Sequence, residues 1–195
     1  MPRGVAIPEL RQQLFTAAEQ VILRDGPGRL SGRAVTAEAR VAAGLLYAHF
    51  TDLDDFLAAY AVDRSFVVTV AAKTLPARAG AGDPASNLAS ALLDIPRDAL
   101  AALARLLVLR PELAERVHDV LGGDTALDAV EQAAADYLEA ERRLGRTAAD
   151  PRAVALAATA ALHHLVLTAE DPDDRLRPAL TALVGSTANE RSGNG

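Results

Sequence analysis

The sequence contains no cysteine and no tryptophan among its 195 residues. The lack of cysteine excludes disulfide bonds, thiolate metal ligands and cysteine nucleophiles. Aromatic residues make up only 4% of the chain, so a hydrophobic core has to be built mainly from alanine, leucine and valine. Because alanine and leucine are strong helix formers, this composition favours helices over sheets.

Long apolar runs are also lacking. No uninterrupted apolar stretch reaches the roughly 18 residues that a membrane-spanning helix needs. The first residues, Met1 to Val5, lack the apolar segment of a secretory signal peptide. Half of the residues are hydrophobic and 24% are charged, which is typical of a soluble globular protein. We therefore expect a cytoplasmic location.

Positive charge is scarce overall, because the net charge is −6, but it is unevenly distributed. Up to Thr51, six arginines stand against four acidic residues, a balance of +2, and the remainder of the chain carries −8. A mildly basic N-terminal segment on an acidic body is expected for a protein that binds nucleic acid through one of its parts.

Helical periodicity begins near the N-terminus. Apolar residues from Leu10 to Ile22 recur at steps of three and four, which predicts a helix that ends at Gly26. A second, short helix is expected from a Ser31 cap to about Ala39, and a third ends near Phe50. A fourth helix runs to about Lys73, with Thr51 as its cap and Asp54 reaching back to the cap residue.

The rest of the chain is also predicted to be helical, after a loop at 76–84 rich in glycine and alanine. Proline and glycine divide it into helices at about 85–94, 97–110, 111–121, 124–145, 151–169 and 175–185. The predicted fold is therefore all-α. Three short helices fall within residues 1–52, and a helical bundle, joined through the fourth helix, spans 53–188. A disordered tail follows at 189–195.

The segment Val35 to Phe50 has the layout of a helix-turn-helix, which can place its second helix in the major groove of DNA. Its end, Leu46-Tyr47-x-His49-Phe50, resembles the DNA-binding domain of the TetR (tetracycline repressor) family, and residues 8–60 carry the resemblance. The resemblance implies a homodimeric repressor that binds double-stranded operator DNA and releases it when a small apolar effector binds.

The resemblance also implies which residues face DNA. The predicted set is Arg33, Thr36, Arg40, Ala42, Ala43, Gly44, Leu45, Tyr47 and His49. Tyr47 and His49 would contact phosphates, and Thr36 or Arg33 would reach the DNA backbone. The alternatives are half-buried packing for Tyr47 and packing at the helix end for His49. Val35, Val41, Leu46 and Phe50 would form the core of the three-helix unit.

The chain departs from the family at several of these positions. Arg40 stands where the family usually has glycine, and Ala42 stands where serine or threonine is common. The remaining groove-facing residues are mostly alanine and leucine, which leaves thymine methyl groups as the main direct contact. We therefore expect weak or restricted DNA affinity with a steep salt dependence. The alternative is a TetR-like ligand- or protein-binding regulator that has lost strong DNA binding.

The resemblance further implies that residues 1–52 form the helix-turn-helix DNA-binding domain. It implies that residues 53–188 form a helical ligand-binding and dimerisation domain, with an effector pocket and a dimer interface. The predicted ligand-binding residues are Tyr60, Phe66, Leu103, Leu107, Tyr137 and His163. The predicted dimer residues, on a stripe of small side chains within 151–169, are Leu156, Ala157, Ala160 and His164. For a single tyrosine or histidine the alternative is a hydrogen-bonded core position, and the stripe could pack only internally.

An enzymatic function is not expected. Glu115-x-x-His118 has the spacing of a di-iron site, but such a site needs a second pair and two further glutamates. The sequence has no serine nucleophile elbow, no phosphate-binding Gly-x-x-x-x-Gly-Lys loop and no His-Glu-x-x-His metal motif. No cofactor and no metal are therefore predicted.

Overall fold

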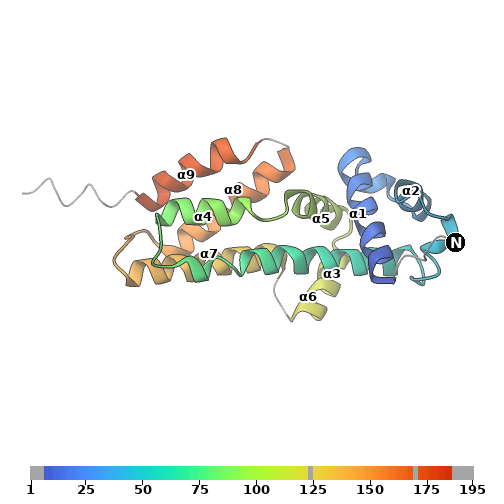
Figure 1. Cartoon of the computed structure of the whole chain (residues 1–195), viewed down its shortest axis with the longest axis horizontal. Helices are drawn as coiled ribbons and strands as arrows, with labels where there is room; N and C mark the ends of the chain where they lie inside the picture. Colours follow the sequence, from blue (N-terminus) through green and yellow to red (C-terminus); the bar gives the residue numbers. More distant parts are fainter. Residues whose placement is uncertain (1–6, 123–124, 169–170, 186–195) are drawn as a thin grey trace, which may run out of the picture. The chain divides into compact units, whose positions relative to one another are not determined.

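The computed structural model describes residues 7–122, 125–168 and 171–185 (Figure 1). Within these ranges the chain is all-helical, as predicted, with nine α-helices, three short 3-10 turns and no strand. The α-helices are α1 (Ile7–Asp25), α2 (Gly32–Glu38), α3 (Leu53–Ala72), α4 (Pro84–Leu93), α5 (Arg97–Leu109), α6 (Glu112–Leu121), α7 (Ala126–Arg143), α8 (Pro151–Thr168) and α9 (Asp173–Gly185). The predicted tail at 189–195 lies outside the described residues. None of the described helices combines the length and apolar character that crossing a membrane requires.

The chain divides into two compact units. Of the described residues, the first unit contains 7–64 and 101–122, and the second contains 65–100, 125–168 and 171–185. The helices α3 and α5 each begin in one unit and end in the other. The first unit therefore holds α6 and most of α5 in addition to the segment predicted to bind DNA.

Two helix starts in the first unit show how local sequence sets the boundaries. The hydroxyl of Ser31 accepts the backbone N–H of Ala34 at 3.2 Å and caps α2, as the sequence predicts. The cap of α3 is Asp52 and not Thr51, because Asp52 Oδ1 accepts the N–H of Asp55 at 2.8 Å. The Asp55 carboxylate in turn accepts the N–H of Thr51 at 3.0 Å. The predicted cap is thus wrong by one residue, since Asp52 and Asp55 satisfy these N–H groups.

The predicted third helix, ending near Phe50, is not a regular α-helix. A 3-10 turn spans Ala43–Leu45, and turns follow up to Phe50. Its backbone hydrogen bonds follow both the 3-10 and the α-helical pattern. Leu45 N–H donates to the carbonyl of Ala42, three residues earlier, at 2.9 Å, whereas Ala48 N–H donates to the carbonyl of Gly44, four residues earlier, at 3.1 Å. Ala42 has no side chain that can cap the segment, and so short a piece gains little from helix propagation.

The first unit has an aromatic core. The ring of Phe15 on α1 lies 6.1 Å from that of Phe50, 5.6 Å from that of Phe56 and 6.0 Å from that of Tyr60, measured between centroids. The predicted core positions Val35, Leu46 and Phe50 are buried, which confirms them, while Val41 is only half-buried. Four of the seven aromatic rings of the chain are thus concentrated in this unit's core.

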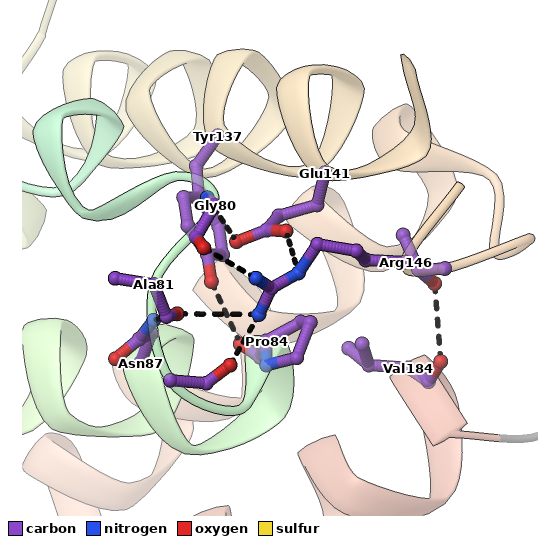
Figure 2. Close-up of polar contacts among 10 residues, drawn as sticks. Gly80, Ala81, Pro84, Asn87, Tyr137, Glu141, Arg146 and Val184 are labelled. Carbon is purple, nitrogen blue, oxygen red and sulfur yellow. Dashed lines mark hydrogen bonds and ion pairs between the residues drawn. The ribbon is translucent and has the colours of Figure 1, made fainter. Parts of the chain in front are cut away.

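The second unit is built from helix pairs, with α7 packed on α8 and α4 packed on α9. A buried charge pair at the end of α7 holds the loop before α4 (Figure 2). The fully buried carboxylate of Glu141 lies 2.8 Å from Nε of Arg146 and accepts the N–H of Gly80 at 3.1 Å. Figure 2 shows the Arg146 guanidinium among the loop carbonyls, donating to those of Gly80, Ala81 and Gly82. Two side chains therefore fix the loop, which no sequence motif indicated.

Candidate nucleic-acid interface

The predicted DNA-facing residues all lie in the first unit, from α2 to the segment that precedes α3. Most of their side chains are open to solvent. Thr36 is buried, and Leu45 and His49 are half-buried. The exposed members are Arg33, Arg40, Ala42, Ala43, Gly44 and Tyr47. Apart from Arg33 on α2, the exposed members follow one another closely in sequence along the turn and the 3-10 segment.

Thr36 is the member that the structure separates from this surface. Its side chain is 1% exposed, and its hydroxyl donates to the carbonyl of Gly32 at 2.8 Å, within α2. A hydroxyl that is buried and satisfied by the backbone has a packing role. Of the two residues predicted to reach the DNA backbone, Arg33 and Thr36, only Arg33 lies on the exposed face of α2, where its side chain can reach a phosphate.

Arg40 is placed in the turn by an uncommon backbone conformation. Its φ of 55° lies in the left-handed region, and it is the one described residue other than glycine with a positive φ. The N–H of Arg40 donates to the carbonyl of Ala37 at 3.1 Å, and Val41 N–H donates to that of Thr36 at 3.0 Å. These two bonds close the C-terminus of α2 in the way that glycine usually does. Arg40 therefore combines a strained backbone with an exposed guanidinium.

Tyr47 lies over the beginning of α2. Its side chain is 54% exposed, yet its ring packs directly against Gly32. A Cβ atom at Gly32 would stand 2.5 Å from the Tyr47 hydroxyl oxygen and 3.1 Å from Cζ. The phenol thus occupies the space that any side chain at Gly32 would need.

The ion pairs decide which arginines of the first unit are available to a DNA backbone. Arg24 pairs with Asp25 at 2.9 Å and with Glu38 at 2.7 Å, and Arg64 is buried against Glu19. Across the described ranges, no ion pair engages the remaining arginines of α1, α2 and the turns beside them, which are Arg11, Arg29, Arg33 and Arg40. Since none of the four is paired with a described carboxylate, each is open to direct contact with a phosphate.

Arg11 was not predicted from the sequence. Its guanidinium lies 4.8 Å from the centroid of the Phe50 ring and 5.8 Å from that of Phe15. A cation held over an aromatic face is attracted by the ring's quadrupole, which fixes an otherwise mobile side chain. Only the tertiary fold brings the beginning of α1 to the end of the predicted DNA-binding motif, so no local pattern could indicate this contact.

The acidic residues beside the motif are partly neutralised by the fold. Asp52 and Asp55 accept backbone N–H groups at the start of α3. Asp54 lies 3.0 Å from the guanidinium of Arg110, which also pairs with Glu112. The negative charge expected near the DNA backbone is therefore smaller than the sequence alone indicates.

Residues 14–60 match the family model described as bacterial regulatory proteins, tetR family. The matched segment covers most of α1, all of α2, the Arg40 turn and the start of α3, and so contains the surface described above. Over this segment the chain is similar to TetR-family transcriptional regulators. The matched family is described as one of regulatory proteins, which agrees with the sequence-based expectation of a regulator.

Several solved structures share the fold of this chain over most of its length. A TetR-like transcriptional regulator from Rhodococcus sp. RHA1 is 23% identical, with a TM-score of 0.64 over 94% of this chain and 95% of that chain. The fatty acid degradation regulator FadR from Bacillus halodurans is 17% identical, with a TM-score of 0.67 over 95% and 99% of the two chains. The multidrug binding protein EbrR, complexed with imidazole, is 24% identical, with a TM-score of 0.56 over 91% and 96%. No protein with a curated description matches the chain.

The predicted ligand-binding residues are divided between the two units. Tyr60, Leu103 and Leu107 belong to the first unit, and Phe66, Tyr137 and His163 belong to the second. Neither unit alone contains all six. Tyr60 packs on Phe15, and the Tyr137 hydroxyl donates to the carbonyl of Pro84 at 3.2 Å, so both tyrosines have structural contacts of their own.

The four predicted dimer residues lie on one exposed face of α8. Leu156, Ala157, Ala160 and His164 are all exposed, and Leu156 is 58% exposed. The opposite face of α8 is buried, through Ala155, Ala158, Leu162 and Leu165. The internal packing of α8 therefore leaves the small-residue stripe uncovered within the described chain.

The Glu115 and His118 pair lies on the exposed face of α6. In the part of the chain that the structure describes, no group of three or more potential ligands gathers around a common point.

Proposed function

We propose that this chain is a TetR-family regulator, a cytoplasmic repressor that binds operator DNA as a homodimer and leaves the DNA when a small, largely apolar molecule binds. The observation that carries the proposal is the surface formed by Arg33, Arg40 and Tyr47. All three side chains are exposed in the segment matched by the family, and no described carboxylate pairs with either arginine. Unpaired guanidinium groups and a phenol hydroxyl are suitable donors to phosphate oxygens.

This surface offers fewer groups that can contact bases than groups that can contact phosphates. The exposed side chains of Ala42 and Ala43 offer only methyl groups, and Gly44 offers backbone alone. Apolar contact with thymine methyl groups is the direct readout that such residues support. The proposed affinity therefore rests mainly on phosphate neutralisation, which makes it depend steeply on salt concentration.

The proposed dimer uses the exposed face of α8. Two recognition segments have to meet half-sites about one turn of DNA apart, which a two-fold dimer achieves. The small side chains of Ala157 and Ala160 allow two helices to approach closely, and Leu156 adds apolar area at the same face. An uncovered stripe of this kind on a helix whose other face is buried supports self-association.

The proposed effector is a small molecule with substantial apolar surface. Structures with the same fold carry ligands in their descriptions: EbrR is complexed with imidazole, and the FadR regulator of Bacillus subtilis is in complex with stearoyl-CoA. For this chain, Phe66, Leu103, Leu107 and His163 stay predicted ligand contacts. The effector would act only through its different affinities for the DNA-binding and released conformations.

A second candidate is a regulator of the same fold that has lost strong DNA binding. Two observations favour it: the recognition segment is a 3-10 turn and not a regular helix, and Ala42 to Gly44 provide no side-chain donors. Such a protein would bind an effector or another protein and would show no preference for its own upstream DNA.

Fluorescence anisotropy with a duplex from the region upstream of the gene separates the two candidates. A repressor binds this duplex more tightly than an unrelated duplex. The logarithm of its affinity falls as the logarithm of the salt concentration rises. In Arg33→Ala and Arg40→Ala this slope should become shallower, by about 0.9 for each phosphate that the arginine no longer neutralises. Arg152→Ala, which removes an exposed arginine of the second unit, serves as the matched control. Equal, weak affinity for both duplexes would refute the repressor and favour the second candidate.

A further inference from the structure

Gly32 is an unfavourable residue for its position. It is the first residue of α2, it is buried, and its φ lies outside the left-handed region, so its backbone conformation does not require glycine. In a helix, glycine costs roughly 1 kcal/mol relative to alanine. The reason for glycine must therefore be sought in what surrounds it.

What surrounds it is Tyr47. An alanine Cβ at Gly32 would meet the Tyr47 hydroxyl oxygen at 2.5 Å, Cζ at 3.1 Å and Cε2 at 3.4 Å. The first of these distances is too short for any real contact, so a side chain at Gly32 has to displace the phenol. The carbonyl of Gly32 is itself fixed by the Thr36 hydroxyl at 2.8 Å, which leaves the tyrosine as the group that moves.

We propose that the missing side chain of Gly32 positions Tyr47 for its contact with a DNA phosphate. The inference rests on the proposed function, since it names a residue that prepares the DNA-binding surface without touching DNA. An exposed tyrosine would otherwise lose side-chain freedom on binding; packing against Gly32 restricts the ring beforehand and lowers that entropic cost. Gly32 is thus a positioning residue, and Tyr47 is the residue that contacts DNA.

The key variant is Gly32→Ala, because the clash involves the far end of a flexible side chain and the fold can absorb it. Alanine is the better helix former, so the variant should unfold at the same temperature as the parent or a higher one. Gly28→Ala is the matched control: Gly28 lies in the same unit, has no left-handed φ, and has open space within 4 Å of its ideal Cβ.

The first measurement does not involve DNA. The chain has three tyrosines, so protein labelled with 3-fluorotyrosine gives three fluorine resonances, and Tyr47→Phe assigns that of Tyr47. Gly32→Ala should shift the Tyr47 resonance and leave the two buried tyrosines, Tyr60 and Tyr137, unchanged. Gly28→Ala should shift none of the three. An unmoved Tyr47 resonance in Gly32→Ala would overturn the inference whatever the protein binds.

The second measurement is a double-mutant cycle on affinity for the upstream duplex. Tyr47→Phe and Gly32→Ala should each weaken binding by roughly tenfold, the size of one hydrogen bond to a charged group. The double variant should bind the duplex as tightly as the single variant with the lower affinity, because both substitutions act on the same contact. The salt slope should not change, since a neutral hydroxyl displaces no counterion.

Two results separate this inference from the proposed function. If the parent binds the upstream duplex and Tyr47→Phe weakens it, but Gly32→Ala binds as the parent does, the positioning role is refuted and the repressor stands. If the parent has no preference for the duplex, the repressor is refuted, and the fluorine resonances still decide whether Gly32 positions Tyr47.

Discussion

Nε of Arg64 on α3 lies 2.9 Å from Oε2 of Glu19 on α1, and both side chains are about nine-tenths buried. The same guanidinium lies 3.0 Å from the Asp63 carboxylate and 6.0 Å from the centroid of the Phe15 ring. An ion pair that is both buried and surrounded by rings allows few alternative arrangements of its two helices. Any displacement of the first half of α3 is therefore transmitted to α1 and to the helix-turn-helix segment that packs on α1.

Removing one partner of this pair should strongly destabilise the protein. Arg64→Met leaves the Glu19 carboxylate buried without its cation, and we expect the free energy of unfolding to fall by about 3–5 kcal/mol in urea titrations. Arg24→Ala, which breaks the exposed pairs with Asp25 and Glu38, should have a much smaller effect, because solvent screens exposed charges. Equal effects of the two substitutions would show that the buried pair has no special role.

The left-handed turn at Arg40 predicts a substitution that stabilises the protein. A residue with a Cβ costs roughly 1–2 kcal/mol in this conformation, and glycine does not. Arg40→Gly should therefore raise the unfolding temperature, whereas Arg33→Gly, at a helical position of α2, should lower it. If Arg40 contacts a phosphate, the same variant loses DNA affinity while it gains stability. A lower unfolding temperature for Arg40→Gly would contradict the strain.

The Glu141–Arg146 pair should stabilise the second unit through the loop that it holds. Arg146→Met removes the cation beside a fully buried carboxylate and the donors to three loop carbonyls, so a loss of about 3–5 kcal/mol is expected. Arg142→Ala is the control, because its partner Glu139 is partly exposed and the pair is worth less than about 1 kcal/mol. Hydrogen exchange should accelerate at Gly80 in the first variant only, and unchanged exchange there would argue against the proposed role of the pair.

Alkaline pH should destabilise the protein through its buried tyrosines. Burial raises the pKa of Tyr137 from 10.0 to about 12, and burial also raises the pKa of Tyr60. Because the folded protein holds the neutral phenol, this stabilisation is complete below pH 10 and is lost as the pH rises toward 12. The unfolding temperature should fall over this interval, and less steeply in Tyr137→Phe. A decline that is equally steep in Tyr137→Phe would exclude a contribution from this residue.

The exposed stripe on α8 predicts how the oligomeric state responds to charge. Ala160→Glu places a carboxylate in the middle of the proposed interface, where it would be buried without a partner. Sedimentation should then give a monomer that keeps its helical circular dichroism. Arg116→Glu, at an exposed position of α6, makes the same change of charge away from α8 and should leave the dimer intact. A monomeric parent protein, or a dimeric Ala160→Glu, would refute this interface.

The sequence predicted those elements whose signals are local. Ser31 stands before α2 and caps it, and proline or glycine marks the ends of most later helices, so their existence follows from propensity and capping. The motif from Leu46 to Phe50 indicated a resemblance to the TetR family, and the family match over residues 14–60 confirms that resemblance. The cap at Asp52 and the 3-10 form of the recognition segment were missed. Both depend on which of several competing backbone and side-chain hydrogen bonds form, and the pattern of residues along the sequence does not show this.

The sequence by itself determined that the chain is helical, which segment resembles a DNA reader and that catalysis is not expected, because periodicity, caps and motifs are properties of neighbouring residues. The tertiary structure alone decided which of the predicted contact residues face solvent. Thr36 is buried, and Tyr47 packs against Gly32. No carboxylate among the described residues pairs with Arg33 or Arg40. The tertiary structure also joined Arg64 to Glu19 and Arg146 to Glu141, because burial and charge pairing arise only when distant segments pack together.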